Sequence, residues 1–395
     1  MRIVMLRGTF EFMKSVNKTT ILNKIRLTGS ISRADISRET GITPPTVSSI
    51  VRELIRDNLV IESHLGQSIG GRKPTLLQLK EDGYYVIGMD AGSKTIKGIV
   101  SDLVGNIYSR EEVEIHPNIT KEEFLTSLSA LVEQLLKGYK QHLGKFLGIG
   151  VAMHGIIDIK SGTSLTSVNS GLISVPIKET LEERFDLPVF VENNSRAMTI
   201  GEYWFGNGGT TKRFAVINIG RGVGAGLIVD NKLIHGAQGV NGEIGHASIS
   251  LDGERCSCGN IGCFETFVTG DAIVRRAKRS IANAPENLTA EKVYYLAKQG
   301  RKEYIQVLEE TGKFIGIGIV NFIHTVNPHK IVLGGGVLKS KEFLFPSILR
   351  TISERVLLDK FREETIIEVS KLGDDITVLG AAALLLNELF YCYSV

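Results

Sequence analysis

Residues 241–246 read Asn-Gly-Glu-Ile-Gly-His, and residues 256–265 read Cys-Ser-Cys-Gly-Asn-Ile-Gly-Cys-Phe-Glu. One imidazole and three thiols therefore fall within a short, glycine-rich stretch. Zinc is held in proteins by nitrogen and sulfur ligands in tetrahedral geometry, and four protein ligands leave no open position for water. The spacing predicts a structural zinc site, while inert buried thiols or a redox pair remain as alternatives. The predicted ligands are His246, Cys256, Cys258 and Cys263.

Two glutamates flank the predicted zinc ligands. Glu243 lies three residues before His246, and Glu265 lies two residues after Cys263. A metal bound between them would hold both carboxylates rigidly, and a fixed carboxylate accepts hydrogen bonds from hydroxyl groups well. The arrangement therefore favours a polyol or a sugar as the ligand.

Length and composition limit the class of protein. The chain has 395 residues, which predicts two or three domains at roughly 150 residues per domain. Its residues are 43% hydrophobic and 23% charged, which excludes intrinsic disorder. No apolar run approaches the roughly 18 residues of a membrane span, and the N-terminus lacks a signal-peptide cleavage pattern. We expect a soluble, cytoplasmic protein without membrane partners, and four cysteines are too few for a disulfide scaffold.

The charge is distributed unevenly along the chain. Residues 1–80 hold 13 Lys and Arg against 6 Asp and Glu, a net charge of +7. Residues 81–395 hold 33 against 37, a net charge of −4. A basic segment is often only a solvated surface, but it is also the mark of a module that binds phosphates.

The pattern of residues 18–79 favours the second interpretation. An apolar stripe predicts a helix that ends at Gly29, and Ser32 begins a second helix as its cap. Gly41 closes that helix, and Thr43 followed by Pro44 begins a third. Strands at residues 59–61 and 75–79 enclose a glycine-rich turn. These elements predict a winged helix-turn-helix over residues 1–80 that binds operator DNA.

The third helix has the two faces of a recognition helix. Its apolar stripe packs inward, and its opposite face carries polar side chains that can enter a major groove. The basic wing, residues 70–74, can contact a neighbouring groove. The predicted DNA contacts are Thr46, Ser49, Arg52, Arg72 and Lys73.

From residue 81 onward strands alternate with helices, which is typical of an α/β fold. Two segments echo each other, because residues 90–93 and 220–224 are glycine-containing loops that each join two strands. Such loops can grip phosphate, although an ordinary glycine hairpin is the alternative. The expected strands are 86–90, 146–153, 189–192, 214–219, 224–229 and 330–333. The expected helices are 121–139, 176–185, 195–205, 270–282 and 313–326.

The helix-turn-helix with its Gly-Gly-Arg-Lys-Pro wing, the Asn-Gly-Glu-Ile-Gly-His segment and the cysteine-rich segment together resemble the ROK family of repressors and sugar kinases. The N-terminal module places the chain with the branch of xylose and N-acetylglucosamine repressors. The resemblance implies a two-lobed actin-like ATPase fold, a sugar in the cleft, and a homodimer or a dimer of dimers. We expect the first lobe at 81–200 and the second, with the zinc loop, at 201–395, the C-terminal helix being able to return to the first lobe.

The resemblance also implies site residues. The sugar contacts fall on Gly155, Asn169, Asn193, Asn194, Glu243, His246 and Glu265. The nucleotide side of the kinases is matched by Gly92, Gly220, Gly222, Gly334, Gly335 and Gly336, and a helix start by Gly380-Ala381-Ala382.

The chain departs from the kinase pattern at four positions. Asn194 stands where the family's aspartate takes the proton from the attacking hydroxyl, so no catalytic residue is assigned. Lys94 and Arg221 stand where the two phosphate loops of the kinases carry threonine. Ile173 occupies the approximate place of a tryptophan, which leaves the identity of the sugar open.

Two functions from different classes follow. The first is a sugar-responsive repressor whose cleft has lost catalysis. The alternative is an ATP- and Mg-dependent hexose or N-acetylhexosamine kinase that retains a DNA-binding domain. A scaffold with a relict cleft is less favoured because Glu243, His246 and Glu265 persist. Asn194 discriminates the first two, since loss of a general base costs about 10²–10⁴ in rate.

Overall fold

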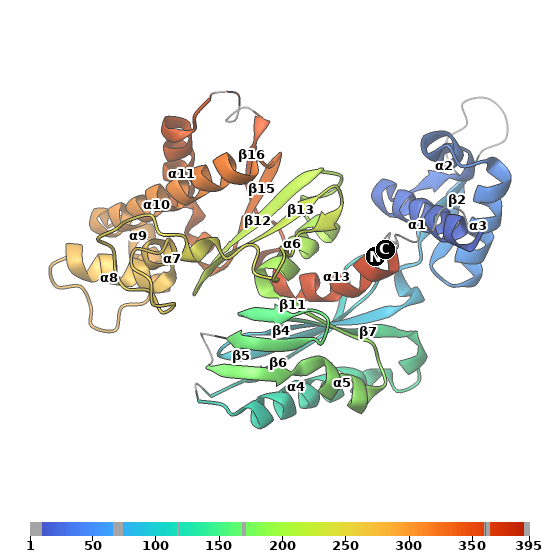
Figure 1. The fold of residues 1–395 in the computed structure, drawn as a ribbon, viewed down its shortest axis with the longest axis horizontal. Helices are drawn as coiled ribbons and strands as arrows, with labels where there is room; N and C mark the ends of the chain where they lie inside the picture. The colour runs from blue at the N-terminus through green and yellow to red at the C-terminus, as the bar shows by residue number, and fades with distance from the viewer. Residues whose placement is uncertain are drawn as a thin grey trace, which may run out of the picture.

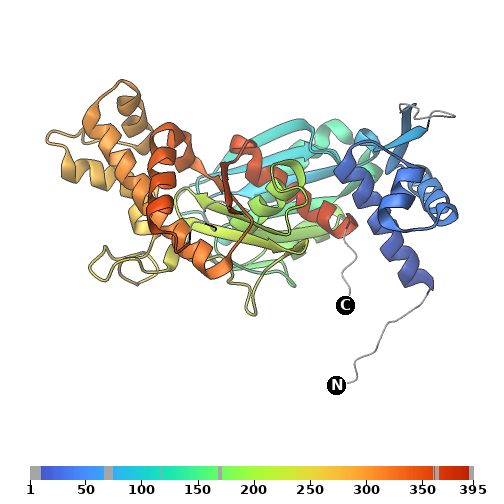
Figure 2. The same cartoon turned by 90° about the horizontal axis from the view of Figure 1, so that it is seen from above.

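The computed structural model describes residues 10–65, 74–116, 118–167, 171–358, 360 and 364–390. A helix-turn-helix module lies at one end of the molecule, and beside it lie two α/β halves, each built on its own sheet, with the first half below and the second above in the view of Figure 1 (Figures 1 and 2). Among the helices of these residues, none combines the length and the apolar character that crossing a bilayer requires.

The N-terminal module forms as its local sequence predicts. The Ser32 hydroxyl accepts from the Asp35 amide at the start of α2, and Gly41 ends α2 with a φ of 71°. Thr43 precedes α3 with Pro44 in its first turn. The predicted apolar stripe of α3 is buried at Val47, Ile50, Val51 and Leu54. The module comprises α1 (Phe10–Thr28), β1 (Ile31–Ser32), α2 (Arg33–Thr40), α3 (Pro44–Arg56), β2 (Val60–Leu65) and β3 (Thr75–Leu79).

The first α/β half is a five-stranded sheet in the order β6-β5-β4-β7-β11. The first three strands form an antiparallel meander, and β7 and β11 add in parallel beyond β4. The strands are β4 (Tyr85–Ala91), β5 (Thr95–Ser101), β6 (Ile107–Glu114), β7 (Phe146–Met153) and β11 (Val189–Asn193). Helices α4 (Lys121–Leu136) and α5 (Ile177–Phe185) cover one face, and a small sheet joins β8 (Ile156–Asp158), β9 (Thr163–Ser167) and β10 (Leu172–Pro176).

The second half repeats this topology. Its sheet has the order β14-β13-β12-β15-β16, again an antiparallel meander followed by two parallel strands. The echo between the two glycine loops is therefore part of a duplication of the whole sheet. The strands are β12 (Arg213–Ile219), β13 (Val223–Val229), β14 (Lys232–Leu233), β15 (Lys330–Gly334) and β16 (Ile366–Val369). The helices are α7 (Glu265–Val268), α8 (Gly270–Ser280), α9 (Ala290–Lys298), α10 (Lys302–Val326) and α11 (Lys341–Arg355).

Two buried helices, α6 (Asn194–Phe205) and α13 (Ile376–Phe390), lie between the sheets (Figure 1). They approach each other closely, because a Cβ added at Gly380 would lie 2.2 Å from the Ala197 carbonyl oxygen. On its other side α13 lies against β4 and β7, where a Cβ at Gly150 would lie 1.8 Å from the Ala381 carbonyl oxygen. Glycines at these crossings let the backbones touch, so α6 and α13 form one rigid unit, which lies against the first sheet through α13.

Some expected boundaries are wrong. Gly380 does not begin a helix but lies within α13, where it serves the contact with α6. Helix α10 begins at Lys302 instead of residue 313. Its first turns are amphipathic and half-exposed, and the expected helix does not include them. The division expected at residue 200 lies inside α6, a helix that also contacts β12 and β13 of the second sheet. We therefore refer to the halves by their sheets.

The N-terminal module packs directly on the α6–α13 pair. The Arg26 guanidinium lies 3.9 Å from the centre of the Trp204 ring, and that ring meets Phe390 edge-on at 4.9 Å. Asn23 Nδ2 donates to the Phe390 carbonyl oxygen at 2.5 Å. Apolar residues of α1 belong to the same buried cluster as the end of α13. The orientation of the module is thus set by the ends of α6 and α13 (Figure 2).

Candidate sugar-binding cleft and zinc centre

A cavity of about 810 Å³ lies between the two sheets, at the ends of their central strands. The sequence-predicted sugar and nucleotide residues converge on it, with one exception: Asn169 lies outside the described residues. The predicted residues in its lining are Gly92, Gly155, Asn193, Asn194, Gly220, Gly222, Glu243, His246, Glu265, Gly334, Gly335 and Gly336.

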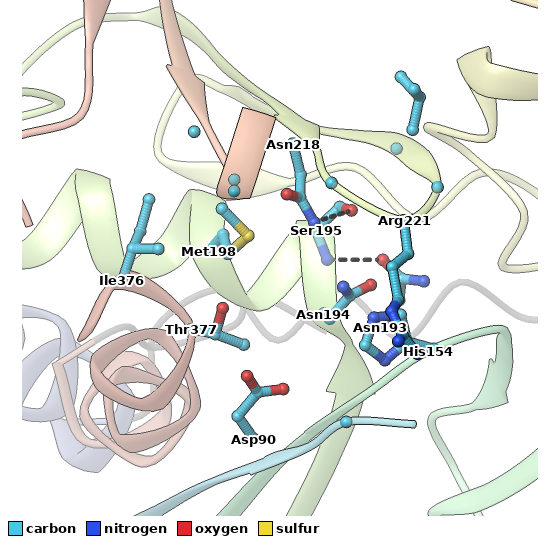
Figure 3. Close-up of a pocket in the computed structure, with 18 of the residues that line it drawn as sticks. Asp90, His154, Asn193, Asn194, Ser195, Met198, Asn218, Arg221, Ile376 and Thr377 are labelled. Carbon is cyan, nitrogen blue, oxygen red and sulfur yellow. Dashed lines mark hydrogen bonds between the residues drawn. The ribbon is translucent and has the colours of Figure 1, made fainter. Parts of the chain in front are cut away.

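One wall of the cavity is the junction of β11 with α6 (Figure 3). The Asn193 side chain caps α6, since its Oδ1 accepts from the Ser195 amide at 2.9 Å. Its Nδ2 donates to the Gly155 carbonyl oxygen at 3.0 Å, which ties the helix start to the β7–β8 turn. Asn194, the next residue, is buried and lines the cavity. The chain thus presents two adjacent amides at a helix N-terminus.

A second wall of the cavity includes two of the predicted metal ligands, His246 and Cys258. The ligand atoms of His246, Cys256, Cys258 and Cys263 all lie within 4.8 Å of one another. His246 Nδ1 is 3.6 Å from Cys256 Sγ, and the sulfurs of Cys258 and Cys263 are also 3.6 Å apart. Tetrahedral zinc with Zn–S bonds of about 2.3 Å separates its sulfur ligands by about 3.7 Å. The four residues therefore fit a zinc ion, which would cross-link the 246–263 loop.

The two glutamates lie beside this cluster. Glu265 Oε1 is 3.7 Å from His246 Nδ1 and accepts from Cys256 Sγ at 3.0 Å. Glu243 Oε2 is 4.0 Å from His246 Nε2 on the cavity side, and burial raises the pKa of Glu243 above its ordinary value. Burial and the Glu265 hydrogen bond raise the pKa of the Cys256 thiol to about 12. A metal cation would offset that cost by binding the thiolate.

The two duplicated loops meet across the cavity. Arg221, from the β12–β13 loop, donates from Nη1 to the Ser93 hydroxyl of the β4–β5 loop at 2.7 Å. Lys94 follows in the same loop and is exposed. Asp90, at the end of β4, is half-buried in the same lining; burial raises its pKa, and its Oδ1 has no hydrogen-bond partner among the described residues. This side of the cleft therefore carries Arg221 and Lys94 at the positions where the resemblance to the kinases predicts hydroxyls.

The DNA side is only partly described. Ser49 and Arg52 are exposed on α3, whereas Thr46 is half-buried with its hydroxyl 2.9 Å from that of Thr43. Arg72 and Lys73 of the wing lie outside the described residues.

Sequence reasoning missed a buried charged group beside the cleft. Arg196 on α6 is 1% exposed and pairs with Glu192 at 2.7 Å, and His235 approaches the other oxygen of that carboxylate. A charged residue in the first turn of a largely buried helix, four residues after a glutamate in the preceding strand, is the signal that could have found it.

Most of the chain matches the profile of a known protein family. The profile of the ROK family matches residues 86–388. The chain belongs to the ROK family. A winged helix-turn-helix DNA-binding profile matches residues 17–61. The xylose repressor of Caldicellulosiruptor bescii is 33% identical over 97% of this chain and 98% of its own length. An N-acetylglucosamine repressor of Escherichia coli is 28% identical over 95% and 94%.

Solved structures of both ROK branches are similar to this chain. A ROK transcriptional regulator, a homologue of the E. coli MLC protein, superimposes with a TM-score of 0.82 at 28% identity, covering 96% of this chain and 97% of its own. A ROK glucokinase from Streptomyces griseus in complex with glucose and AMPPNP gives a TM-score of 0.69 at 30% identity, covering 76% and 98%. The expected family and fold, an N-terminal winged helix-turn-helix followed by a kinase-like ROK domain, are confirmed.

Proposed function

We propose that this ROK protein is a sugar-responsive transcriptional repressor. The observation that carries the proposal is the contact of the helix-turn-helix with α6 and α13, the helices that also line the cleft at Asn194, Met198 and Ile376. A ligand that changes the cleft thereby acts on the same rigid unit that sets the DNA-binding module. The similarity to xylose and N-acetylglucosamine repressors over nearly the whole chain supports this function.

On the DNA side, we assign base contacts to Ser49, Arg52 and Thr46 of α3, and phosphate contacts to Arg72 and Lys73 of the wing. Two copies in a homodimer, or a dimer of dimers, would bind an inverted repeat with half-sites about 34 Å apart or a multiple of that distance. Because operator DNA is the partner, we place the protein in the cytoplasm.

On the ligand side, we assign a monosaccharide to the cavity. Asn193 and Asn194 offer amides from one wall, and Glu243, His246 and Glu265 offer acceptors and a ring nitrogen from the other. Zinc bound by His246 and the three cysteines would supply structure only: it would fix the loop that carries the second wall. His246 Nε2 faces Glu243 on the cavity side, so it remains available to a sugar hydroxyl.

The second candidate is an ATP-dependent sugar kinase that retains its DNA-binding module. It is favoured by Asp90 at the end of β4, just before the first loop, by the glycines at 334–336, and by the likeness to the S. griseus glucokinase. Against it stands Asn194, because an amide cannot take a proton from the sugar hydroxyl at neutral pH. Arg221 and Lys94 further alter the phosphate loops.

One experiment separates the two functions. The full chain is screened by thermal shift with D-xylose, D-glucose and N-acetyl-D-glucosamine, each with and without ATP and magnesium, and active sugars are then added to the protein bound to fragments of its own genome. A sugar at about 100 times its Kd stabilises the fold by about 2.7 kcal/mol. We expect a sugar that stabilises without nucleotide and changes DNA affinity. Sugar phosphorylation above about 1 s⁻¹ would instead establish the kinase.

A further inference from the structure

The two walls of the cleft are joined by one buried guanidinium. Arg196 donates from Nε to Glu192 Oε1 at 2.7 Å, within the first wall. From Nη1 it donates to the carbonyl oxygens of Gly239 at 2.9 Å and Asn241 at 3.1 Å, within the second wall. A guanidinium is suited to this because its donors diverge in a fixed plane.

The carboxylate of Glu192 organises the other half of the group. Its Oε1 also accepts from the Asn193 amide at 2.7 Å, and its Oε2 lies 2.7 Å from His235 Nε2. Burial alone would raise the pKa of Glu192, but the His235 hydrogen bond and the Arg196 charge hold it below its ordinary value. An ionised carboxylate can only accept, so the His235 ring donates to it.

The segment that Arg196 holds leads straight to a sugar residue. The Asn241 amide donates to the His235 carbonyl oxygen at 3.1 Å, and the Ala225 amide donates to the Gly242 carbonyl oxygen at 2.7 Å. Gly242 has a φ of 97°, and a Cβ there would lie 1.9 Å from the Ala225 carbonyl oxygen. Glu243 follows this constrained glycine, so its place depends on the carbonyl groups that Arg196 binds.

We infer that Arg196 is a positioning residue for sugar binding: by bonding Glu192 on one side and the 239–241 carbonyls on the other, it sets the spacing between Asn193 and Glu243. It touches no ligand itself, since it lies behind both walls. The inference rests on the proposed function only for its sugar-binding consequence, because the coupling of the two segments is a property of the free protein.

The test compares three variants of the full chain. Arg196→Met removes every donor at similar length, and Arg196→Lys keeps the charge beside Glu192 but loses the planar fork. The matched control is Lys330→Met, a partly buried cation that donates to the Asn207 carbonyl oxygen at 3.1 Å and to Glu368 at 3.3 Å, away from the cavity lining. Each variant is examined by amide hydrogen exchange without ligand, by zinc content, and by calorimetric titration with D-xylose, D-glucose and N-acetyl-D-glucosamine.

We expect Arg196→Met to speed exchange in residues 236–243 by about 10-fold or more, and to weaken sugar binding by a similar factor, with zinc retained. Arg196→Lys should give intermediate values for both. Lys330→Met should leave this segment and the sugar affinity unchanged while lowering thermal stability. Unchanged exchange in residues 236–243 of Arg196→Met, or equal acceleration there in Lys330→Met, overturns the inference.

Two further outcomes are decisive. If Arg196→Met does not fold, Arg196→Lys carries the test, and full sugar affinity with unchanged exchange in that variant refutes the role. If the unmodified chain binds none of the three sugars, the proposed effector class fails, while the exchange measurement still decides whether Arg196 holds the 239–241 segment.

Discussion

Two aspartates with buried carboxylate oxygens are in opposite situations, and they allow a test of what the cleft costs in stability. Asp90, at the end of β4, is a half-buried residue of the cavity lining, but its Oδ1 is buried and has no hydrogen-bond partner among the described residues. Asp102, just beyond β5, is fully buried and accepts from the amides of Val104 and Asn106, each at 2.9 Å, and from the Tyr108 hydroxyl at 3.2 Å.

We expect Asp90→Asn to stabilise the protein at neutral pH and Asp102→Asn to destabilise it. Asp90→Asn replaces a poorly solvated charge by a neutral amide, which should recover part of a desolvation penalty of about 1–3 kcal/mol, and losing bonds made to a charged acceptor at Asp102 costs a similar amount. At about 2–4 °C per kcal/mol in domains of roughly 150–250 residues, the two variants should move the melting temperature by several degrees in opposite directions. Calorimetry of the full chain measures both shifts.

The effect of Asp90→Asn on stability should depend on pH. Burial raises the pKa of Asp90 above its ordinary value of 3.8, although His154 and Lys97 oppose the increase. The folded protein thus holds this proton more tightly than the unfolded chain. The stability contributed by the protonated form is complete below the unfolded pKa and is lost as pH rises through the folded pKa. The advantage of Asp90→Asn should therefore shrink toward acid pH. A destabilised Asp90→Asn variant at neutral pH, or an advantage independent of pH, refutes the reasoning.

Three other predictions concern function. Purified protein should contain about one zinc per chain by elemental analysis, and Cys258→Ser should lose both the zinc and the sugar-induced thermal shift. Full sugar affinity in metal-free protein would contradict this. Arg52→Ala should weaken binding to selected operator sequences, whereas Arg72→Ala should weaken all DNA about equally and reduce the salt dependence; footprinting and titration at two salt concentrations compare them, and equal affinity of the full chain and a chain lacking residues 1–80 would refute both. Asn194→Asp should restore little ATP-dependent phosphorylation alone and more with Lys94→Thr and Arg221→Thr, because γ-phosphate positioning and proton abstraction are needed together; a coupled ADP-release assay measures it, and turnover above about 1 s⁻¹ in the unmodified chain would reverse the order of the two proposed functions.

Local signals explain what the sequence could predict. The helix starts at Ser32 and Thr43 depend on neighbours only a few residues away, and both residues take the N-cap position, although only the Ser32 side chain caps a backbone amide. The metal ligands are also close in sequence, so their spacing alone predicted a cluster that the fold does bring together.

Contacts between residues far apart in the chain explain what the sequence could not predict. Gly380 lies inside α13 because it must touch Ala197, more than a hundred residues earlier in the chain. The role of Arg196 also depends on distant contacts, since its partners Gly239 and Asn241 lie in the loop that follows β14, more than forty residues later in the chain. A helix pattern shows a glycine or a charge as an anomaly, but only the packing reveals what it is for.

The contact of Arg26 with Trp204 places the far end of α6 against the DNA-binding module, while the near end, at Asn193 and Asn194, lies in the cleft. Because α6 reaches both the cleft and the DNA-binding module, an effect of sugar binding on DNA binding implies the reverse effect as well. Thermodynamic linkage requires that any factor by which sugar changes affinity for the operator is also the factor by which the operator changes affinity for the sugar. A repressor bound to its operator therefore has a different sugar affinity from the free protein. The sugar concentration that releases half of the operators is set by the affinity of the DNA-bound form, whereas affinity is usually measured on the free protein.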